Sequence, residues 1–444
     1  MKSIQFLFLS FILLLSAKIS VQAQQTLDYS FVTVGCNRVD NADSTANKPS
    51  TANVYQLNRL FAEVAALNPL PDYLFFTGDL VIGYSTDTVR LAQELRGWIA
   101  LYKASPLYGK STVLVAIPGN HETQNAAAGK LSFVAAERTF VREMADYIIG
   151  NNGPVATGLV PGTDSLITNQ SQLTYSFDHK GSHFVMLDTD PVGRDSRVPN
   201  YWINQDITAA RTNGAKHIFV FGHKPAYPSV LTPTDGLVAY PYQRNIFWNI
   251  LESNQCEAMF AAHNHLWEKQ QPDAGKTWQI IAGNGGSSLE SGTPNPYFGY
   301  TLVNVYTNGN VTVSSYGRDL NSTNYSYAAT QNPTTLRDST SITFGLLSTG
   351  VVKPQSANPF GLTVAPNPVD DTASLSFHLL KSGVCTLKLY SLKGNPLQTF
   401  VDQQLDAGNH QYTFDTSNLS NGTYLISLIS NGQQVTQKVV VMKK

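Results

Sequence analysis

Short apolar runs alternate with amphipathic segments from residue 31 to about residue 262, and this alternation constrains the fold more than any other feature. Ahead of the run DYLFF (72–76), five apolar residues fall on one helical face. Such alternation favours an α/β domain whose strands are mostly parallel. The other runs typical of buried strands are TVLVAI (112–117), HFVMLD (183–188), HIFVF (217–221) and EAMFAA (257–262).

The pattern changes after Trp278, where strands replace the alternation. The segments YTLVNVY (300–306) and VTVSSY (311–316) flank an Asn-Gly turn, which is typical of a hairpin. Residues 331–360 lose the periodicity and are expected to form a linker. From residue 361 to residue 444, alternating strands with Gly and Asn turns predict a small all-β sandwich. We therefore expect an α/β domain over 24–330, a linker, and a β-sandwich domain over 361–444.

The first 23 residues have the pattern of a signal peptide. One lysine precedes the apolar run FLFLSFILLLS (6–16), and VQA (21–23) resembles a cleavage site. The run is short for a membrane span, although a retained anchor is the alternative. We expect a secreted or cell-surface protein with no transmembrane segment in the mature chain. The net charge of −1 argues against the basic patch that nucleic-acid binding needs.

Polar residues suited to metal binding follow four of the apolar runs. Because each set comes directly after a strand, we expect all of them at the carboxyl edge of one sheet, where α/β sheets place ligand sites. Asp, Asn and His offer oxygen and nitrogen ligands for Zn, Fe or Mn. One such residue alone is usually a turn or a packed histidine, but turn chemistry rarely gives four in order. The sets are GD (78–79), NHE (120–122), GH (222–223) and HNH (263–265).

These stretches resemble the motifs of the calcineurin-like metallophosphoesterases, including the purple acid phosphatase branch. The matching pieces are GD, GNHE (119–122), GH and AHNH (262–265), and the similarity covers roughly residues 28–320. The resemblance implies a four-layer α/β/β/α sandwich, in which two mixed sheets pack face to face with helices outside. It also implies a metal-dependent phosphoesterase, which hydrolyses a phosphoester with a metal-activated water.

The resemblance further implies a pair of metal ions, divalent or trivalent, with Zn, Fe or Mn expected. Asp79 is expected to bridge the two ions. Asn120, His223 and His263 are expected to complete one metal site, and His265 is expected to belong to the other.

Two further residues receive catalytic roles from the same resemblance. His121 is expected near the leaving group of the substrate, and Glu122 is expected to hold the ring of His121. The substrate stays open among monoesters, diesters, nucleotides, phytate and phospholipid head groups, because the loops that choose among them carry no readable code.

The first motif of the family falls on FVTVGCNRVDN (31–41), where this chain departs from the pattern. Cys36 stands in place of an aspartate ligand, and Arg38 stands in place of a histidine. Arginine does not bind metals because its guanidinium stays protonated. The branch's tyrosine, three residues after the GD aspartate, is here Ile82, and Tyr84 lies off register.

Three interpretations of this departure stay open. In the first, the Cys36 thiolate ligates a thiophilic metal together with Asp79 and His265, and Arg38 clamps a phosphate oxygen. In the second, this first metal is weak or absent, and one metal acts with Arg38. In the third, the domain is a catalytically impaired surface module that binds phosphorylated ligands. Cys36 as a small buried residue at a turn is the simplest alternative to ligation. A disulfide with Cys256 is not expected, because the two lie at opposite strand ends.

The last segment resembles the C-terminal sorting domain of type IX secretion. The matching pieces are PNP (366–368), LYSLKGNPL (389–397), LSNGTYLISL (419–428) and KVVVMKK (438–444). The resemblance implies export across the outer membrane, with the outer-membrane secretion machinery as a partner. The alternative is a carbohydrate-binding or adhesive β-module, because a small β-sandwich alone does not fix function.

Overall fold

The computed structural model describes most of the chain, apart from the first residues, part of the predicted linker and several short segments. The predicted signal peptide (1–23) and residues 343–359 of the predicted linker lie outside the described residues. Within the described part, no helix combines the length and apolarity needed to cross a membrane. The described residues are 25–39, 47–48, 52–125, 129–160, 163–228, 236–272, 275–290, 292–293, 296–319, 332–342, 360–379, 381–391, 395–430 and 433–443.

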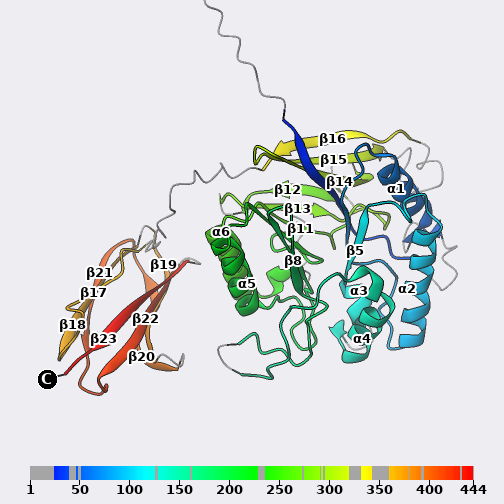
Figure 1. Ribbon diagram of the computed structural model, residues 1–444. Helices are drawn as coiled ribbons and strands as arrows, with labels where there is room; N and C mark the ends of the chain where they lie inside the picture. Colours follow the sequence, from blue (N-terminus) through cyan, green and yellow to red (C-terminus); the bar gives the residue numbers. More distant parts are fainter. Residues whose placement is uncertain are drawn as a thin grey trace, which may run out of the picture.

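The first sheet has six strands in the order β16-β15-β14-β1-β4-β5 (Figure 1). Its strands β1, β4 and β5 are parallel, and β14, β15 and β16 extend it as antiparallel neighbours. The predicted hairpin is confirmed by the register of β14 with β15. The bounds are β1 Leu27–Val34, β4 Tyr73–Thr77, β5 Val113–Ile117, β14 Tyr297–Tyr306, β15 Val311–Asp319 and β16 Thr335–Ser341.

The second sheet also has six strands, in the order β12-β13-β11-β10-β9-β8. Its four central strands are parallel, and the two edge strands are antiparallel. The predicted α/β class with mostly parallel central strands is thus confirmed. The bounds are β8 Tyr175–His179, β9 Ser182–Leu187, β10 His217–Gly222, β11 Ala258–Ala261, β12 Trp267–Gln270 and β13 Trp278–Ala282.

The helices cover the outer faces of the two sheets, which confirms the α/β/β/α sandwich (Figure 1). Helices α1 (Val54–Ala66), α2 (Thr88–Lys103) and α4 (Val134–Glu143) pack on the first sheet, whereas α5 (Asn200–Thr212) and α6 (Pro241–Ser253) pack on the second. The remaining short elements are α3 Asn120–Thr123, the 3-10 turns η2 Ala145–Tyr147 and η3 Leu237–Ala239, and the strand pairs β2 Asn47–Lys48, β3 Ala52–Asn53, β6 Gln124–Asn125 and β7 Leu131–Ser132.

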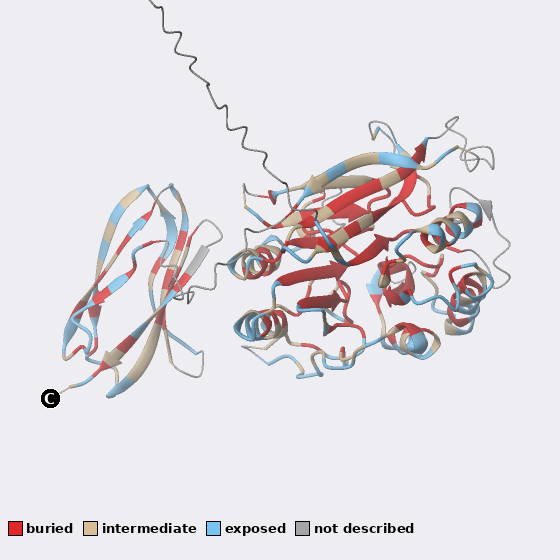
Figure 2. Ribbon diagram, turned by 45° about the horizontal axis from the view of Figure 1, so that its top comes forward, coloured by how far each residue is buried: buried red, intermediate tan, exposed pale blue. Residues whose placement is uncertain are grey.

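An aromatic core joins the facing surfaces of the two sheets. Phe31 on β1 lies edge-on to Phe75, Phe219 and Phe260, with ring centroids 5.1–5.6 Å apart. Figure 2 shows that buried residues gather on the strands, while exposed residues line the outer sides of the helices. Because the two sheets are fixed to each other by this core, the loops at their strand ends are held in a constant relation.

Residues 335–341, expected to belong to the linker, form the edge strand β16 instead. This strand pairs with β15 from Thr312 to Gly317. Its sequence TLRDSTS is polar, and most of its side chains are exposed or half-buried. It is therefore held mainly by backbone hydrogen bonds, which leave no apolar periodicity for sequence analysis to detect.

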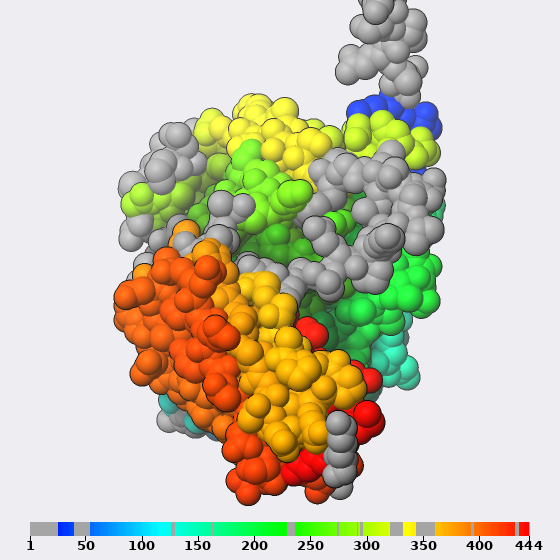
Figure 3. Space-filling view, turned by 90° about the vertical axis from the view of Figure 1, so that its left-hand side faces the viewer, coloured from blue at the N-terminus to red at the C-terminus, as the bar shows by residue number. Residues whose placement is uncertain are grey.

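The C-terminal region is all-β, as predicted, with its own apolar core. Its strands form the orange to red body in the space-filling view (Figure 3). They are arranged in two antiparallel sheets, in the orders β17-β18-β21 and β20-β19-β22-β23. The bounds are β17 Thr363–Ala365, β18 Thr372–Leu379, β19 Gly383–Ser391, β20 Pro396–Leu405, β21 Gly408–Asp415, β22 Gly422–Ser430 and β23 Gln433–Val441.

Candidate metal centre

The side chains expected to bind metal converge from both sheets. The expectation that they line the edge of one sheet is wrong, because the loops after β1, β4 and β5 belong to the first sheet and those after β10 and β11 belong to the second. The sequence shows that each residue follows a strand but not which sheet that strand joins. The first sheet contributes Cys36, Asp79 and Asn120, and the second contributes His223, His263 and His265.

The loops that carry these residues have unusual backbone conformations. Positive φ angles occur at Cys36 (60°), Arg38 (58°), Asp79 (55°), Tyr84 (50°) and His263 (65°). A non-glycine residue in this region costs about 1 kcal/mol or more, and such strain gathers at functional sites. Half of the ten non-glycine residues with positive φ in the described chain lie here.

Glycines allow the loops from the two sheets to approach each other. Gly78 has φ +85°, and a Cβ atom there would lie 2.5 Å from His223 Nδ1. A Cβ atom on Gly119 would lie 2.4 Å from the backbone nitrogen of Asp79. The GD motif therefore needs glycine for both its positive φ and close packing, whereas the glycine of GNHE is needed for close packing.

Four residues form what we call the histidine–asparagine site: Asp79, Asn120, His223 and His263. Asn120 Oδ1 lies 2.8 Å from His223 Nε2 and 2.9 Å from His263 Nδ1. His223 Nε2 lies 3.0 Å from Asp79 Oδ1, and the two ring nitrogens are 3.2 Å apart. All four side chains are buried or largely buried.

The tautomer of His223 decides what this site can hold. Its Nδ1 lies 2.8 Å from the carbonyl oxygen of Thr77, which can only accept, so we assign the ring hydrogen to Nδ1. His223 Nε2 then presents a lone pair to a carboxylate oxygen, an amide oxygen and a second ring nitrogen. A single proton satisfies only one of these contacts, whereas a metal ion satisfies all of them. The two nitrogen and two oxygen ligands suit Zn, Fe or Mn.

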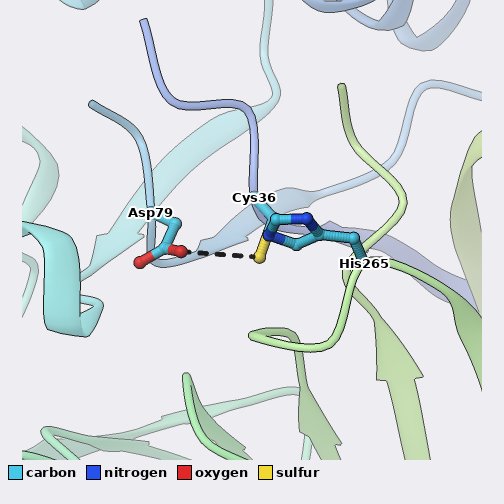
Figure 4. A group of neighbouring side chains, drawn as sticks. All are labelled: Cys36, Asp79 and His265. Carbon is cyan, nitrogen blue, oxygen red and sulfur yellow. Dashed lines mark hydrogen bonds between the residues drawn. The ribbon is translucent and has the colours of Figure 1, made fainter. Parts of the chain in front are cut away.

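A second group, which we call the cysteine site, consists of Cys36, Asp79 and His265. Their ligand atoms lie within 4.8 Å of one another, and Figure 4 shows the three side chains converging from separate loops. Cys36 Sγ lies 3.9 Å from Asp79 Oδ2 and accepts a hydrogen bond from the backbone nitrogen of His263 at 3.2 Å. His265 Nδ1 donates to the carbonyl oxygen of Ser288 at 2.6 Å, and its buried Nε2 has no hydrogen-bond partner among the residues that the structure describes. The three residues predicted for the altered site are therefore neighbours.

Arg38 forms hydrogen bonds with the carboxylate of Asp79, which belongs to both groups of candidate ligands. Its Nε and Nη2 both donate to Asp79 Oδ2 at 3.1 Å. The Arg38 side chain is 18% exposed and the Asp79 side chain is fully buried. The guanidinium predicted to clamp a phosphate thus already pairs with a carboxylate, a point that matters for how many ions the centre holds.

The side chains around Asp79 lower the pKa of its carboxyl group. Burial alone raises the pKa of this carboxyl, but His121, His223 and Arg38 outweigh burial and hold the pKa well below its ordinary value. Burial, followed by the Asp79 carboxylate, raises the pKa of the Cys36 thiol well above its ordinary range. Asp79 is therefore the main negative charge of the centre.

The expected role of Glu122 is wrong. Its carboxylate does not hold the ring of His121 but accepts from the backbone nitrogens of Gly119 (2.7 Å), Asp79 (3.0 Å) and Val81 (3.0 Å). The short helix α3 turns Glu122 back toward the amides that precede it. Glu122 therefore fixes the backbone that carries Asp79.

The ring of His121 is held by the carbonyl oxygen of Ile82, 2.5 Å from its Nδ1. Its Nε2 lies 3.8 Å from Asp79 Oδ2, so His121 borders the site as expected. Burial lowers the pKa of His121 to about 3, although the neighbouring Asp79 carboxylate opposes this shift.

Sequence analysis missed two residues at the centre. Tyr84, judged off register as a metal ligand, accepts a hydrogen bond from Asn120 Nδ2, and its ring contacts that of His121 at a tilt of 44° with ring centroids 3.9 Å apart. Lys224, which follows His223, donates from its buried Nζ to Asp190 Oδ1 at 2.6 Å. Lys224 could have been noticed because it directly follows a predicted ligand, whereas the contact of Tyr84 with Asn120 depends on loop conformation that the sequence does not show.

Two family models match the chain. Residues 50–267 match the model of the calcineurin-like phosphoesterase, and residues 363–442 match the model of the secretion system C-terminal sorting domain. None of the curated proteins compared with the chain matches it.

Several solved structures are similar to the chain. A purple acid phosphatase from yellow lupin (Lupinus luteus) seeds has 15% identity and a TM-score of 0.49, covering 72% of this chain and 54% of that chain. GAP50, the anchor in the inner membrane complex of Plasmodium, has 12% identity and a TM-score of 0.41, covering 72% and 89%. A putative 5'-nucleotidase from Staphylococcus aureus has 13% identity and a TM-score of 0.33, covering 72% and 55%.

These structural similarities are too low to transfer an activity or a site. The chain also spans about half the length of the lupin phosphatase. The family models are the firmer finding. The sorting-domain match, 363–442, coincides with strands β17 to β23, whereas the phosphoesterase match, 50–267, covers only part of the two sheets, which run from Leu27 to Ser341. The chain therefore carries a calcineurin-like phosphoesterase domain, which is a domain of phosphoric ester hydrolases, over residues 50–267 and a secretion system C-terminal sorting domain over residues 363–442.

Proposed function

We propose that this protein is a secreted phosphoesterase that depends on a metal ion held by Asp79, Asn120, His223 and His263. The observation that carries the proposal is the convergence of four potential ligand atoms, since His223 Nε2 lies within 3.2 Å of Asp79 Oδ1, Asn120 Oδ1 and His263 Nδ1. A metal ion can interact with all four of these atoms at once, and nitrogen and oxygen ligands of this kind suit Zn, Fe or Mn.

A metal ion bound there supplies a water of lowered pKa, which is the nucleophile that phosphoester hydrolysis needs at neutral pH. The residues of the chain position the reacting groups. Asp79 offers Oδ1 toward His223, while Arg38 brings a positive charge beside its other oxygen. His121 lies next to this carboxylate and is proposed to contact the leaving group.

The alternative function is a surface module that binds phosphorylated ligands without hydrolysing them. The pairing of Arg38 with Asp79 favours this alternative, because it uses two of the donors that would hold a substrate phosphate in the active centre. Arg38 keeps its remaining donors and is partly exposed, so it can contact a phosphate in either case.

The C-terminal sorting domain indicates type IX secretion to the cell surface or beyond. The proposal adds the predicted signal peptide over residues 1–23 as the first export step. It also takes the outer-membrane secretion machinery as the partner that reads residues 363–442.

The test is metal content and hydrolysis by the full chain. Purified protein is incubated with excess Zn²⁺, Mn²⁺ or Fe²⁺, freed of unbound metal, and analysed for bound metal. Hydrolysis of p-nitrophenyl phosphate and of bis-p-nitrophenyl phosphate is measured on the same samples. We expect bound metal and hydrolysis in the wild type and loss of both in His223→Ala. The His179→Gln variant is the matched control, since His179 lies on β8 and pairs with Asp72.

Binding of metal and phosphate without hydrolysis would favour the surface module. Absence of bound metal with each of the three ions would refute the proposal.

A further inference from the structure

We propose that the centre holds one metal ion per chain, in the histidine–asparagine site, and that the guanidinium of Arg38 takes the place of a second cation. This inference rests on the proposed function and specifies its metal content. It departs from the pair of ions that the family resemblance implies.

The two oxygens of Asp79 have different partners. Oδ1 lies 3.0 Å from His223 Nε2 and 3.3 Å from the backbone nitrogen of His121. Oδ2 accepts from both Nε and Nη2 of Arg38 at 3.1 Å. An ionised carboxylate has about four lone-pair directions, two on each oxygen. The two donors of Arg38 thus fill the directions of Oδ2, which is the oxygen that a second ion beside Cys36 would need.

The backbone that carries Arg38 is fixed beside Asp79. The nitrogens of Asn37 and Arg38 both donate to the carbonyl oxygen of Asp79 at 2.9 Å, and the nitrogen of Cys36 donates to that of Gly78 at 3.0 Å. The loop after β1 is therefore tied to the loop after β4 by three hydrogen bonds. Arg38 cannot leave Asp79 Oδ2 simply by a movement of a free surface loop.

Of the other two members of the cysteine site, Cys36 has a hydrogen-bond partner without a metal ion, whereas the buried Nε2 of His265 has none among the described residues. Cys36 Sγ accepts from the backbone nitrogen of His263 at 3.2 Å and is completely buried. His265 is fixed by its bond to Ser288, and its Nε2 can accept a hydrogen bond from a substrate hydroxyl or a solvent molecule. A divalent ion among these residues would lie close to a permanent positive charge, which opposes its binding.

The structure thus divides the centre into a metal half and an arginine half, both attached to Asp79. In the metal half, uncharged oxygen and nitrogen ligands converge beside Oδ1. In the arginine half, the guanidinium of Arg38, which stays protonated and belongs to the chain itself, neutralises the charge on Oδ2. The remaining donors of Arg38 stay available to a phosphate oxygen of the substrate.

The test is the number of ions bound by the full chain and by three variants at Arg38, measured by elemental analysis after equilibration with excess Zn²⁺ and removal of free metal. We expect one ion per chain in the wild type and in Arg38→Lys, which keeps the charge. Two ions are expected in Arg38→His, which frees Oδ2 and adds a ligand. If Arg38→His does not fold, Arg38→Ala frees the same oxygen and is also expected to bind a second ion, more weakly.

Substitution with Co²⁺ gives a second readout that does not depend on activity. Thiolate-to-cobalt charge-transfer absorption is expected in Arg38→His but not in the wild type, because only the variant brings Cys36 into coordination. Two ions in the wild type, thiolate absorption in the wild type, or one ion in both Arg38→His and Arg38→Ala would each overturn the inference. Two ions in the wild type would leave the proposed function intact, whereas no ion in any sample would overturn both.

Discussion

Replacing Glu122 by alanine removes the acceptor of three buried backbone amides. The carboxylate accepts from Gly119, Asp79 and Val81, and Glu122 is only 1% exposed. An unsatisfied buried donor costs about 1–3 kcal/mol, so the three together set a range of about 3–9 kcal/mol. Because the loop can relax toward solvent, we expect a loss near the lower end of that range in the free energy of unfolding.

Glu122→Gln should lose less than Glu122→Ala. One oxygen of Glu122 accepts from both Gly119 and Asp79, and the other accepts from Val81 alone. A glutamine can keep the first two bonds with its amide oxygen, but its NH₂ group then faces the amide of Val81. We expect a loss of about 1–3 kcal/mol, the cost of one unsatisfied donor.

The assay is urea unfolding followed by tryptophan fluorescence. All five tryptophans lie before residue 343, so the signal reports the phosphoesterase domain and not the sorting domain. The control is Arg96→Ala, which removes one ion pair to Glu143 from an arginine side chain that is 64% exposed and should leave the free energy of unfolding nearly unchanged. If Glu122→Ala were as stable as this control but slower in hydrolysis, Glu122 would act on the ring of His121, and the backbone role would be refuted.

Three further predictions concern other parts of the domain. Tyr84→Phe removes the hydroxyl that accepts from Asn120 Nδ2. The loss of this hydrogen bond should weaken metal binding about 2–10-fold, measured by competition titration with a chelator. An unchanged affinity would contradict the proposed orientation of Asn120. Gly78→Ala should lose bound metal, and its free energy of unfolding should fall more than that of Gly109→Ala. Both glycines have positive φ, but only Gly78 is crowded by His223. Equal losses of stability in the two variants would show that φ alone matters. Burial lowers the pKa of His183, but hydrogen bonds to Asp206 on α5 and Asp178 on β8 outweigh it and raise the pKa above its ordinary value. The contribution of His183 to the free energy of unfolding should therefore be complete below a pH of about 6.5 and be lost as the pH rises through the higher pKa of the folded state. His183→Asn should lose stability at low pH and show a flatter pH dependence of urea unfolding than the wild type. A pH dependence parallel to that of the wild type would contradict this.

The sequence predicted the helices and strands in which apolar and polar residues alternate with a regular period. The apolar face of α1, with Leu57, Leu60 and Phe61, is buried as expected, and Gly309 has the positive φ that the Asn-Gly turn of the β14–β15 hairpin requires. The edge strand β16 was missed because a polar strand held by backbone bonds leaves no pattern.

The centre was predictable in its residue types but not in its contacts. Asp79, Asn120, His223 and His263 could be named because each follows a strand, yet their assignment to two sheets depends on strand order. The direction of Glu122 depends on the turn at α3, and the contact of Tyr84 with Asn120 depends on loop conformation. The replacement of a histidine by Arg38 was visible in the sequence, whereas its pairing with Asp79 Oδ2 required the structure.

The most direct measurement is anomalous diffraction from crystals of the full chain grown with Zn²⁺. We predict a peak about 2.0–2.2 Å from Asn120 Oδ1, His223 Nε2, His263 Nδ1 and Asp79 Oδ1, the usual span for zinc bound to these atoms. Crystals with no anomalous peak among those atoms, or with zinc only at unrelated surface positions, would contradict the claim that they form a metal centre.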